Sequence, residues 1–427
     1  MTAEIGVLNR LGVALAADSA VSVGREADKI WTSADKLFHL SQSAPVGLMV
    51  YGNAHFIGIP WETVVKEFRR DLADSRFDRL EQYADQFFRF LASNRSLFPM
   101  SSQDQMASEL IKSLFLHLRH EVEDRLTCEA EQRGGINEAE IAPIVNSVVT
   151  DRLHLIRQQT ILAGFGKDAI AKIRGRYGPI VRRKRDEVFG KLPIFTGTKR
   201  KISSIALEML VRHYFGPSWS GVVIAGFGES EAMPALYAYE LEEMVVNQPR
   251  RVLFHSTQIT LKNRAVITPF AQQESVHTFL SGVDQDLAEY MRRSTESLFT
   301  GVIGSILDAV GNIDETLKED LSAAINPGVQ HTLGELFKNW QKQTTFYWRP
   351  ILEIVASLPK DELAGMAEAL VNLTKFRRRI TPERETVGGP IDVAVITKGD
   401  GFVWISRKHY FEPRLNPRVV ARYNREG

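Results

Sequence analysis

The second residue of the chain is the first candidate for chemistry. If the initiator Met1 is removed, which is usual before a small residue, Thr2 carries both a hydroxyl and a free α-amine. An N-terminal amine can act, directly or through a water, as the base that activates the hydroxyl of its own residue. Its reference pKa of about 7.7–8.0 leaves a neutral fraction near pH 7. Thr2 alone is weak evidence, because many chains begin with Met-Thr, and while Met1 remains Thr2 has no free amine.

Three further features stand at the ends of predicted strands. Asp18 ends the second strand, Lys36 begins the third, and Tyr51-Gly52 ends the fourth and opens a helix. If the two hairpins pair in one sheet, these groups meet at the same end as Thr2. The charge of Lys36 would then lower the pKa of the Thr2 amine and hydroxyl, and Asp18 would hold Lys36 in place. Backbone N–H groups at Tyr51 or Gly52 could bind an oxyanion, a contribution of about 3–4 kcal/mol.

The elements that would position these residues are two hairpins followed by a helix. Short β-type runs bounded by turn residues mark the strands. Trp61, Val64, Val65 and Phe68 recur at the spacing of an amphipathic helix. The predicted strands cover residues 5–8, 13–17, 36–40 and 46–51.

Strand and helix patterns follow one another in blocks along the rest of the chain. The order strands, helices, strands, helices, strands predicts an α+β protein with two antiparallel sheets and helical layers outside them, because single strands do not alternate with single helices. Helical spacing is found at residues 77–98, 103–133, 137–159, 283–310 and 329–378, and strand patterns at 221–226, 235–240, 252–260, 276–280, 391–397 and 402–406.

Composition argues against several classes of function. Lys plus Arg total 53 against 52 Asp plus Glu, so no net field would attract nucleic acid or a membrane surface, and neither is expected as a partner. The single cysteine, Cys128, cannot form an intramolecular disulfide, which fits a reducing compartment. No apolar run is long enough to span a bilayer, and the N-terminus lacks the pattern of a signal peptide. We therefore expect a cytoplasmic protein.

Other catalytic motifs are missing from the sequence, and the one metal motif is weak. There is no Gly-x-Ser-x-Gly elbow, no phosphate-binding loop and no complete Gly-x-Gly-x-x-Gly. His117 and His120 lie near Glu121 and Glu123 on a predicted helix. Zinc sites usually need three or four ligands at defined spacings, so surface positions are favoured for both histidines. No metal and no cofactor is expected.

The segments around Thr2 resemble the opening of a proteasome β subunit or of its bacterial HslV-type homologue. The spacing of sixteen residues from Thr2 to Asp18 matches that family. The resemblance is spread over the whole chain in family order, and it continues at residues 36–38, 49–54, 222–237, 280–282 and 388–397.

This resemblance implies a four-layer αββα N-terminal-nucleophile hydrolase sandwich with additional helical insertions. It also implies threonine-type hydrolysis of amide bonds and assembly into rings or related open oligomers. Thr2 would be both nucleophile and base, with Lys36 tuning its pKa and Asp18 as the partner of that lysine. The family places a serine beside the threonine, and the matching residue here is Ser281.

Several positions depart from the family pattern. Ala20 stands where the family has an arginine, Tyr51 replaces the first glycine of the oxyanion pair, and Val387 stands where a serine is expected. The expected acid falls on Arg384, between two glutamates. Backbone donors tolerate a changed side chain, so Tyr51 is a mild departure, whereas the changes near Arg384 affect the supporting network.

The chain is roughly twice as long as the subunits of that family, and helical insertions account for most of the excess. These insertions could form a docking surface for an ATPase unfoldase, or they could replace such a partner. The expected parts are residues 2–74, an N-terminal half-sheet and first helix; 75–215, a helical insertion with the second core helix; 216–310, core strands and a third helix; 311–350, a second helical insertion; and 351–427, the last core helix, the final strands and a basic tail.

The sequence thus predicts a proteasome-like threonine peptidase that cleaves peptide or polypeptide substrates within a homo-oligomer. Two alternatives stay open. One is a non-proteolytic amidase of the same fold, and the other is a structural or assembly homologue without turnover. Retention of Met1 would favour the structural alternative.

Overall fold

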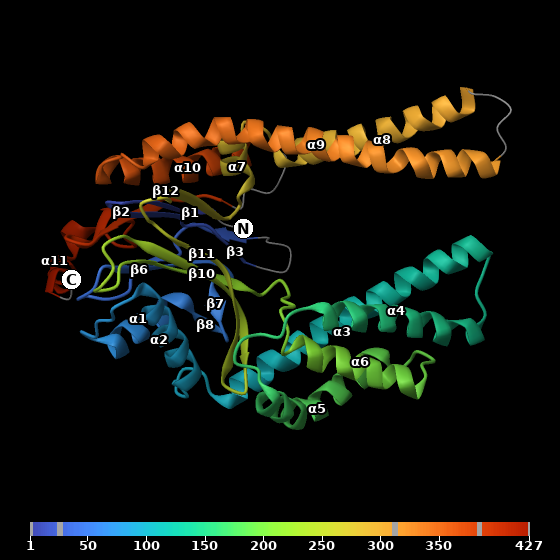
Figure 1. Ribbon diagram of the computed structural model, residues 1–427. Coiled ribbons are helices and arrows are strands. Elements are labelled where there is room, and N and C mark those ends of the chain that lie inside the picture. Colours follow the sequence, from blue (N-terminus) through green and yellow to red (C-terminus); the bar gives the residue numbers. More distant parts are fainter. Residues whose placement is uncertain (1–2, 24–28, 310–314, 382–386, 426–427) are drawn as a thin grey trace. The chain divides into compact units, whose positions relative to one another are not determined.

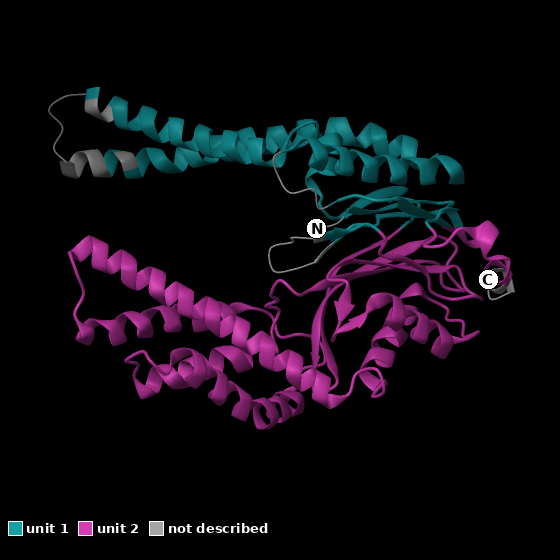
Figure 2. Cartoon of the chain, turned by 180° about the vertical axis from the view of Figure 1, so that it is seen from behind, with its two compact units in different colours: residues 1–32, 259–395, 404–408 teal, residues 33–258, 396–403, 409–427 magenta. Residues whose placement is uncertain are grey.

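The structure is a computed structural model that describes residues 3–23, 29–309, 315–381 and 387–425 (Figure 1). Thr2 lies outside these residues, and so does Arg384 with its two neighbouring glutamates. The chain divides into two compact units (Figure 2). Unit 1 comprises residues 1–32, 259–395 and 404–408, and unit 2 comprises residues 33–258, 396–403 and 409–427.

Unit 1 is built on a five-stranded sheet with the strand order β12-β1-β2-β13-β14. β1 pairs antiparallel with both β12 and β2, so that Ile5 lies opposite Pro269 on one side and Ala16 on the other. The end of the β13–β14 hairpin, residues 396–403, is assigned to unit 2. The strands are β1 (Ala3–Asn9), β2 (Gly12–Asp18), β12 (Ala265–Ala271), β13 (Ile391–Thr397) and β14 (Gly401–Ser406).

Helix α10 supplies most of the helical side of the core of unit 1. Leu363, Ala367, Leu370 and Val371 recur at helical spacing and are buried against strand residues such as Ile5. Acidic residues in the first turn of α10 and arginines in its last turn favour the helix through its dipole. The helices of this unit are α7 (Glu274–Ser281), α8 (Gln285–Ala309), α9 (Glu315–Val355) and α10 (Lys360–Ile380).

One predicted strand of unit 1 is a helix. Residues 276–280 belong to α7, where Val276 is buried and Phe279 is half exposed. A short apolar run cannot be assigned to a strand or to a buried helix by periodicity alone. The prediction of a strand at 276–280 is therefore wrong.

Unit 2 contains a second five-stranded sheet, whose order is β11-β10-β9-β6-β5 and whose neighbouring strands all pair antiparallel. Its longest hairpin, β10–β11, turns at Val246 and Asn247, which have φ values of 46° and 63°. Two consecutive residues with positive φ form the type I′ turn that suits a twisted hairpin. The strands are β5 (Leu37–His39), β6 (Val46–Gly52), β9 (Ser220–Gly226), β10 (Ala235–Val245) and β11 (Gln248–Gln258).

Two helices cover one face of this sheet. Helix α1 (Trp61–Leu72) buries Trp61, Val64, Val65 and Phe68, which confirms the periodicity predicted from the sequence. Helix α2 (Leu80–Ser93) adds aromatic residues such as Phe87 to the same core. The cluster includes residues of β6 and β9, so the sheet and both helices share one core.

The remaining helices of unit 2 form a helical insertion with a core of its own. It consists of α3 (Met100–Arg133), α4 (Glu138–Gln158), α5 (Lys167–Phe189) and α6 (Thr196–Met209), and its core includes Val245 of β10. The buried side chain of Gln103 attaches α3 to the β10–β11 turn, because it accepts the N–H of Asn247 and donates to the Asn247 side chain. The helices predicted at residues 77–98, 103–133 and 137–159 are confirmed by α2, α3 and α4.

Short elements complete the described chain. They are β3 (Val21–Val23), β4 (Lys29–Trp31), β7 (His55–Phe56), β8 (Ile59–Pro60), the 3-10 helix η1 (Pro413–Leu415) and α11 (Pro417–Arg425). No helix among the described residues is both long and apolar enough to cross a membrane. The expected class, a mixture of helices and antiparallel sheets, is confirmed.

The two N-terminal hairpins do not pair in one sheet, so the condition under which Asp18, Lys36 and the Tyr51-Gly52 turn would meet in that sheet is not met. β1 and β2 belong to the sheet of unit 1, and β5 and β6 belong to the sheet of unit 2. Each hairpin completes its sheet with a strand far along the chain, β1 with β12 and β6 with β9. The local pattern identifies a strand, but it carries no information about such a distant partner.

Candidate functional site

Asp18 is a buried carboxylate at the end of β2 that binds backbone N–H groups of unit 1. Its Oδ1 accepts the N–H of Ala3 at 3.2 Å, and its Oδ2 accepts the N–H of Gly388 at 2.9 Å and that of Ala20 at 3.3 Å. Ala3 directly follows Thr2 in the chain. Asp18 therefore holds the first described peptide group of β1, from which Thr2 extends.

The segment before β13 contacts Asp18 and its neighbour Ser19 through backbone hydrogen bonds. Ser19 donates its N–H to Gly388 O at 3.2 Å and its hydroxyl to Pro390 O at 2.7 Å. Gly389 has a φ of 76°, and a Cβ there would lie 2.8 Å from Cβ of Thr32. Only glycine fits this position, because the backbone is left-handed and the neighbouring chain is too close.

Lys36 lies next to the end of β6 in unit 2. The residue is 4% exposed, and its carbonyl accepts the N–H of Val50 at 2.8 Å. In the same segment, burial and the charge of Arg69 lower the pKa of His39 to about 4, so His39 is neutral at pH 7. Lys36 is the one lysine or arginine between residues 33 and 40.

Gly52 is the residue of β6 best placed to offer a free backbone N–H. Successive N–H groups of a strand point to opposite sides, and the N–H of Val50 points to Lys36. The N–H of Gly52 therefore points to that same side, past the point where β5 begins at Leu37, whereas the N–H of Tyr51 points to β9. Gly52 is exposed, unlike the other residues of β6.

Gly52 also has to be glycine. Its φ is 80°, and a Cβ would lie 2.8 Å from Trp219 O. The following N–H, of Asn53, donates to that same carbonyl at 3.1 Å. Trp61 at the start of α1 donates its Nε1 to Ser220 Oγ at 3.0 Å, which fixes the turn to β9.

Tyr51 fills the space that a glycine on the neighbouring strand leaves open. Its buried ring lies over Gly221, where an added Cβ would overlap the ring at 2.0 Å, and it packs edge to face on Trp219 with centroids 5.6 Å apart. The role of Tyr51 in this structure is therefore packing. Between the two candidate oxyanion donors, the geometry favours Gly52.

Ser281 is the last residue of α7, and its hydroxyl bonds to the end of that helix. Its Oγ lies 2.7 Å from His277 O and 2.8 Å from Val283 O, and it accepts the N–H of Val283 at 3.3 Å. This arrangement stabilises the turn that follows α7. The role of Ser281 beside Thr2 stays a prediction.

The predicted site residues are divided between the two units. Asp18 and Ser281 belong to unit 1, whereas Lys36 and the Tyr51-Gly52 turn belong to unit 2. Within unit 2, the β5–β6 pairing brings Lys36 to the end of β6. The sequence did not predict that backbone N–H groups donate to Asp18. The Gly388-Gly389 pair was a signal that the backbone comes close to another part of the chain there.

The weak metal motif lies on the surface, as predicted. His117 and His120 are both exposed on α3, and His120 lies 3.6 Å from Asp124. Within the described ranges, no three His, Cys, Asp or Glu side chains are grouped as metal ligands would be.

A second buried charged cluster, in unit 2, lies at a bulge of β10. Glu242 and Arg250 form a fully buried ion pair, and Arg250 also donates to the carbonyls of Met209 and Tyr214. The adjacent Glu243 has a φ of 54°, and its Oε2 has no hydrogen-bond partner in the described part of the chain. Burial, and then the neighbouring Glu242, raise the pKa of Glu243 to about 7.

Of the comparisons with known proteins, the one with solved structures finds similar chains. No protein-family model matches the chain, and no curated protein matches it. Among solved structures, the chain is similar to a Gly-1 mutant of Anbu from Hyphomicrobium sp. strain MC1, with 10% identity over 99% of this chain and 96% of the other. The TM-score is 0.28.

Proposed function

We propose that this chain is a proteasome-like N-terminal threonine hydrolase that cleaves peptide amide bonds. The observation that carries the proposal is the hydrogen bond from Ala3 N–H to the buried Asp18, sixteen residues after Thr2. A carboxylate at this place fixes the backbone next to the proposed nucleophile. Positioning of this kind is needed because a reacting group must be held close to its attack geometry.

The proposed reaction uses the two functional groups of Thr2. Its hydroxyl oxygen attacks the carbonyl carbon of the scissile amide while the hydroxyl proton moves to the α-amine. The C–N bond then breaks, the leaving amine takes that proton, and an ester to Thr2 remains. Water cleaves the ester with the same amine as base, which releases the acid and restores the hydroxyl.

Other residues have supporting roles in this proposal. The N–H of Gly52 is the donor to the oxyanion, in keeping with its exposure and direction. Lys36 supplies the positive charge that lowers the pKa of the Thr2 amine. Asp18 positions the strand. The four-layer αββα arrangement, the five-part domain division and a cytoplasmic location belong to the same proposal, as does an ATPase unfoldase partner.

The decisive test is Thr2→Ala, after intact-mass measurement has established whether Met1 is absent. We expect cleavage of an unfolded fluorescent casein and of short fluorogenic peptides to fall by at least about a thousandfold, since the nucleophile is lost. Thr127→Ala removes an exposed threonine of α3 and should leave cleavage unchanged. Unchanged turnover of the Thr2→Ala protein would refute the proposal.

The same assay separates the alternatives. Hydrolysis of small amides without cleavage of peptides would favour the non-proteolytic amidase. A retained Met1 with no turnover would favour the structural homologue. Lys36→Ala should remove activity, and Lys36→Arg should not restore it fully, because arginine keeps the charge but not the shape or the acidity of lysine.

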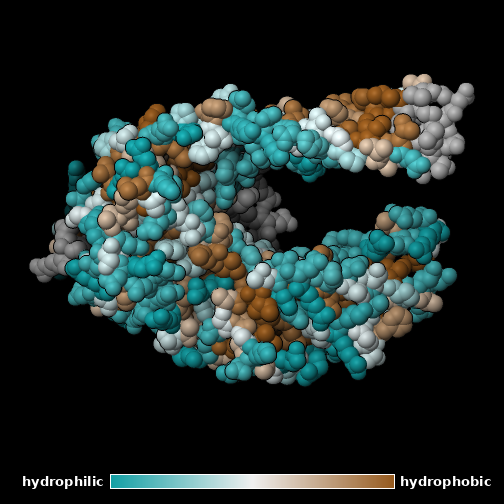
Figure 3. All heavy atoms as spheres, viewed as in Figure 1, coloured by the Kyte–Doolittle hydropathy of each residue, from teal (hydrophilic) through white to brown (hydrophobic). Residues whose placement is uncertain are grey.

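We also propose that the active form is a homo-oligomer, with helix α8 at the contact between copies. Leu287, Met291, Leu298, Val302 and Ile306 follow one stripe of this helix and are 44–68% exposed. Figure 3 shows hydrophobic residues gathered on the outer part of the α8–α9 pair. An apolar stripe of this length is usually covered by a partner.

Sedimentation velocity tests the assembly. A Leu298→Glu, Val302→Glu double variant should sediment as a smaller species than the wild type. Thr300→Glu is the matched control, because Thr300 is exposed on the opposite side of the same helix. An unchanged sedimentation coefficient of the double variant would place the contact elsewhere.

A further inference from the structure

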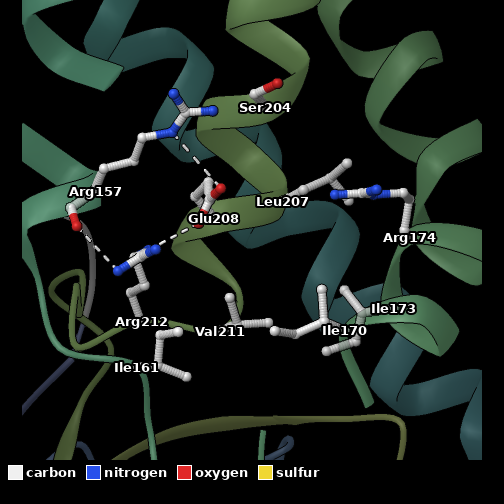
Figure 4. A pocket seen from close by; sticks show the side chains of 10 residues that line it. All are labelled: Arg157, Ile161, Ile170, Ile173, Arg174, Ser204, Leu207, Glu208, Val211 and Arg212. Atoms are coloured by element: carbon white, nitrogen blue, oxygen red, sulfur yellow. Dashed lines mark hydrogen bonds and ion pairs between the residues drawn. The ribbon is translucent and has the colours of Figure 1, made fainter. Parts of the chain in front are cut away.

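The helical insertion of unit 2 contains a cavity of about 440 Å³ that the proposed hydrolysis does not use. Residues of α5 and α6, the end of α4 and the segments that follow α4 and α6 line it (Figure 4). Its volume is within the range of small-molecule sites.

The floor of the cavity is aliphatic and held by backbone hydrogen bonds. Ile173 and Val211 are buried, and Ile161 is 45% exposed at the cavity. Leu162 donates its N–H to Val211 O at 2.9 Å, and His213 donates its N–H to Thr160 O at 2.9 Å. The segments after α4 and α6 thus form a short ladder, so the apolar surface exists before any ligand binds.

Arg212 is a structural member of one wall. Its Nε donates to Glu208 Oε2 at 2.8 Å, and its Nη1 donates to the carbonyls of Arg157 at 3.0 Å and Gln159 at 2.6 Å. The guanidinium of Arg212 thus donates its hydrogen bonds to groups of the protein itself. Arg212 therefore fixes Glu208 and the end of α4.

The other two arginines leave an excess of positive charge at the cavity. Arg157 is half exposed and lies 3.7 Å from Glu208, which also pairs with Arg212. Arg174 is exposed and forms no ion pair with any residue the structure describes. In Figure 4, Arg174 extends toward Leu207 from the side opposite Arg157 and Glu208. The lining therefore has three guanidinium groups and one carboxylate.

We propose that this cavity binds an apolar chain that ends in a carboxylate, with Arg174 binding the anion. The aliphatic floor would bury the chain, and burial of apolar area drives such binding. A guanidinium binds a carboxylate through two parallel hydrogen bonds. A bare inorganic anion would leave the floor exposed to water, and a cation would be repelled by the excess charge.

Two sources supply this chemistry, a free fatty acid and the C-terminus of a polypeptide with apolar last residues. Titration calorimetry on the full chain would use decanoate as the first probe and decanol as its neutral control. The peptide acetyl-Ala-Leu-Leu with a free carboxylate, and the same peptide as an amide, form the second arm. The source with the lower Kd is the better match, and in either arm the neutral form should bind at least about tenfold more weakly.

Variants then assign the anion site. Arg174→Gln should raise the Kd of the acid probe about tenfold, since it removes a charged hydrogen-bond donor. Arg183→Gln, an exposed arginine on the same helix that does not line the cavity, should leave the Kd unchanged. Ile161→Ser should weaken binding several-fold through the apolar floor.

Three results would overturn the proposal. They are equal binding of decanoate and decanol together with equal binding of the acid and amide peptides, equal effects of the Arg174→Gln and Arg183→Gln variants, and binding of inorganic phosphate as tight as that of decanoate. Because Arg174 is exposed, its replacement should not affect folding, and an unchanged urea midpoint would verify this.

Discussion

Asp18 lies at the end of β2 and Glu243 lies at a bulge of β10. Both are buried acids, yet their surroundings differ. Asp18 accepts three backbone N–H groups of unit 1, whereas Oε2 of Glu243 has no hydrogen-bond partner among the described residues. A buried carboxylate that accepts backbone N–H groups holds the chain around it. Where such hydrogen-bond donors are missing, burial favours the protonated form of the carboxyl group. Burial alone therefore does not identify a functional acid, and the donors around it have to be examined.

The largest effect is expected for Asp18→Ala. The variant leaves the N–H groups of Ala3, Ala20 and Gly388 without their acceptor, and each buried unsatisfied group costs about 1–3 kcal/mol. We expect a loss of about 3 kcal/mol or more in the free energy of unfolding, together with loss of peptide cleavage. Urea unfolding and the cleavage assay measure both.

Asp18→Asn is the conservative partner of that variant. It keeps one acceptor oxygen, so its loss of stability should be smaller than that of Asp18→Ala. A wild-type urea midpoint for the alanine variant would show that the three hydrogen bonds of Asp18 do not hold this part of unit 1.

The next effect is a pH dependence at Glu243. Its pKa rises from 4.5 in the unfolded reference to about 7 in the folded protein. The folded state therefore binds the proton more tightly, and the stability that this gives is complete below pH 4.5 and is lost as the pH rises through 7. The stability of Glu243→Gln relative to the wild type should thus increase by up to ~3 kcal/mol from pH 4.5 to pH 8.

Urea unfolding across this pH range tests the prediction. Glu131→Gln, an exposed glutamate of α3, is the control and should show a difference that does not change with pH. The charged neighbours Glu242, Arg250 and Glu109 remain in both proteins, so their own contributions largely cancel. If the difference in the free energy of unfolding between Glu243→Gln and the wild type did not change with pH, Glu243 would have the same pKa in the folded and unfolded states.

The smallest effect is expected at Ser19, beside Asp18. Ser19→Ala removes the hydrogen bond to Pro390 O and should lower the free energy of unfolding by about 1 kcal/mol. Cleavage activity should stay near that of the wild type. A loss as large as that of Asp18→Ala would show that the hydroxyl of Ser19, and not the carboxylate, organises this segment.

Local patterns in the sequence predicted much of the fold. The spacing of Trp61, Val64, Val65 and Phe68 gave α1, because one face of this helix is apolar. The hairpin runs gave β1, β2, β5 and β6, since each is a short apolar segment between turn residues. The division of these strands between two sheets could not be predicted, because their partners β12 and β9 lie far along the chain.

The candidate site was predictable in residue type but not in environment. The positions of Asp18, Lys36 and Gly52 at strand ends follow from turn signals, and the structure gives Gly52 the geometry that requires glycine. The choice between Tyr51 and Gly52 needed the direction of the N–H groups along β6. Glu243 and Arg250 were not singled out in the sequence, and both are buried beside the irregularity in the β10–β11 pairing.

The pairing of β1 with distant strands has a consequence for synthesis on the ribosome. The partner β12 follows β1 by more than half the chain, and Gly388, which donates to Asp18, follows that residue by 370 positions. At about 5–20 residues per second, the ribosome needs roughly 20–70 s to make this stretch. Most of unit 2 is continuous from residue 33 to 258 and can fold during that time. The surroundings of Asp18 are therefore completed last, so a nascent chain cannot carry the proposed activity before its synthesis is nearly finished.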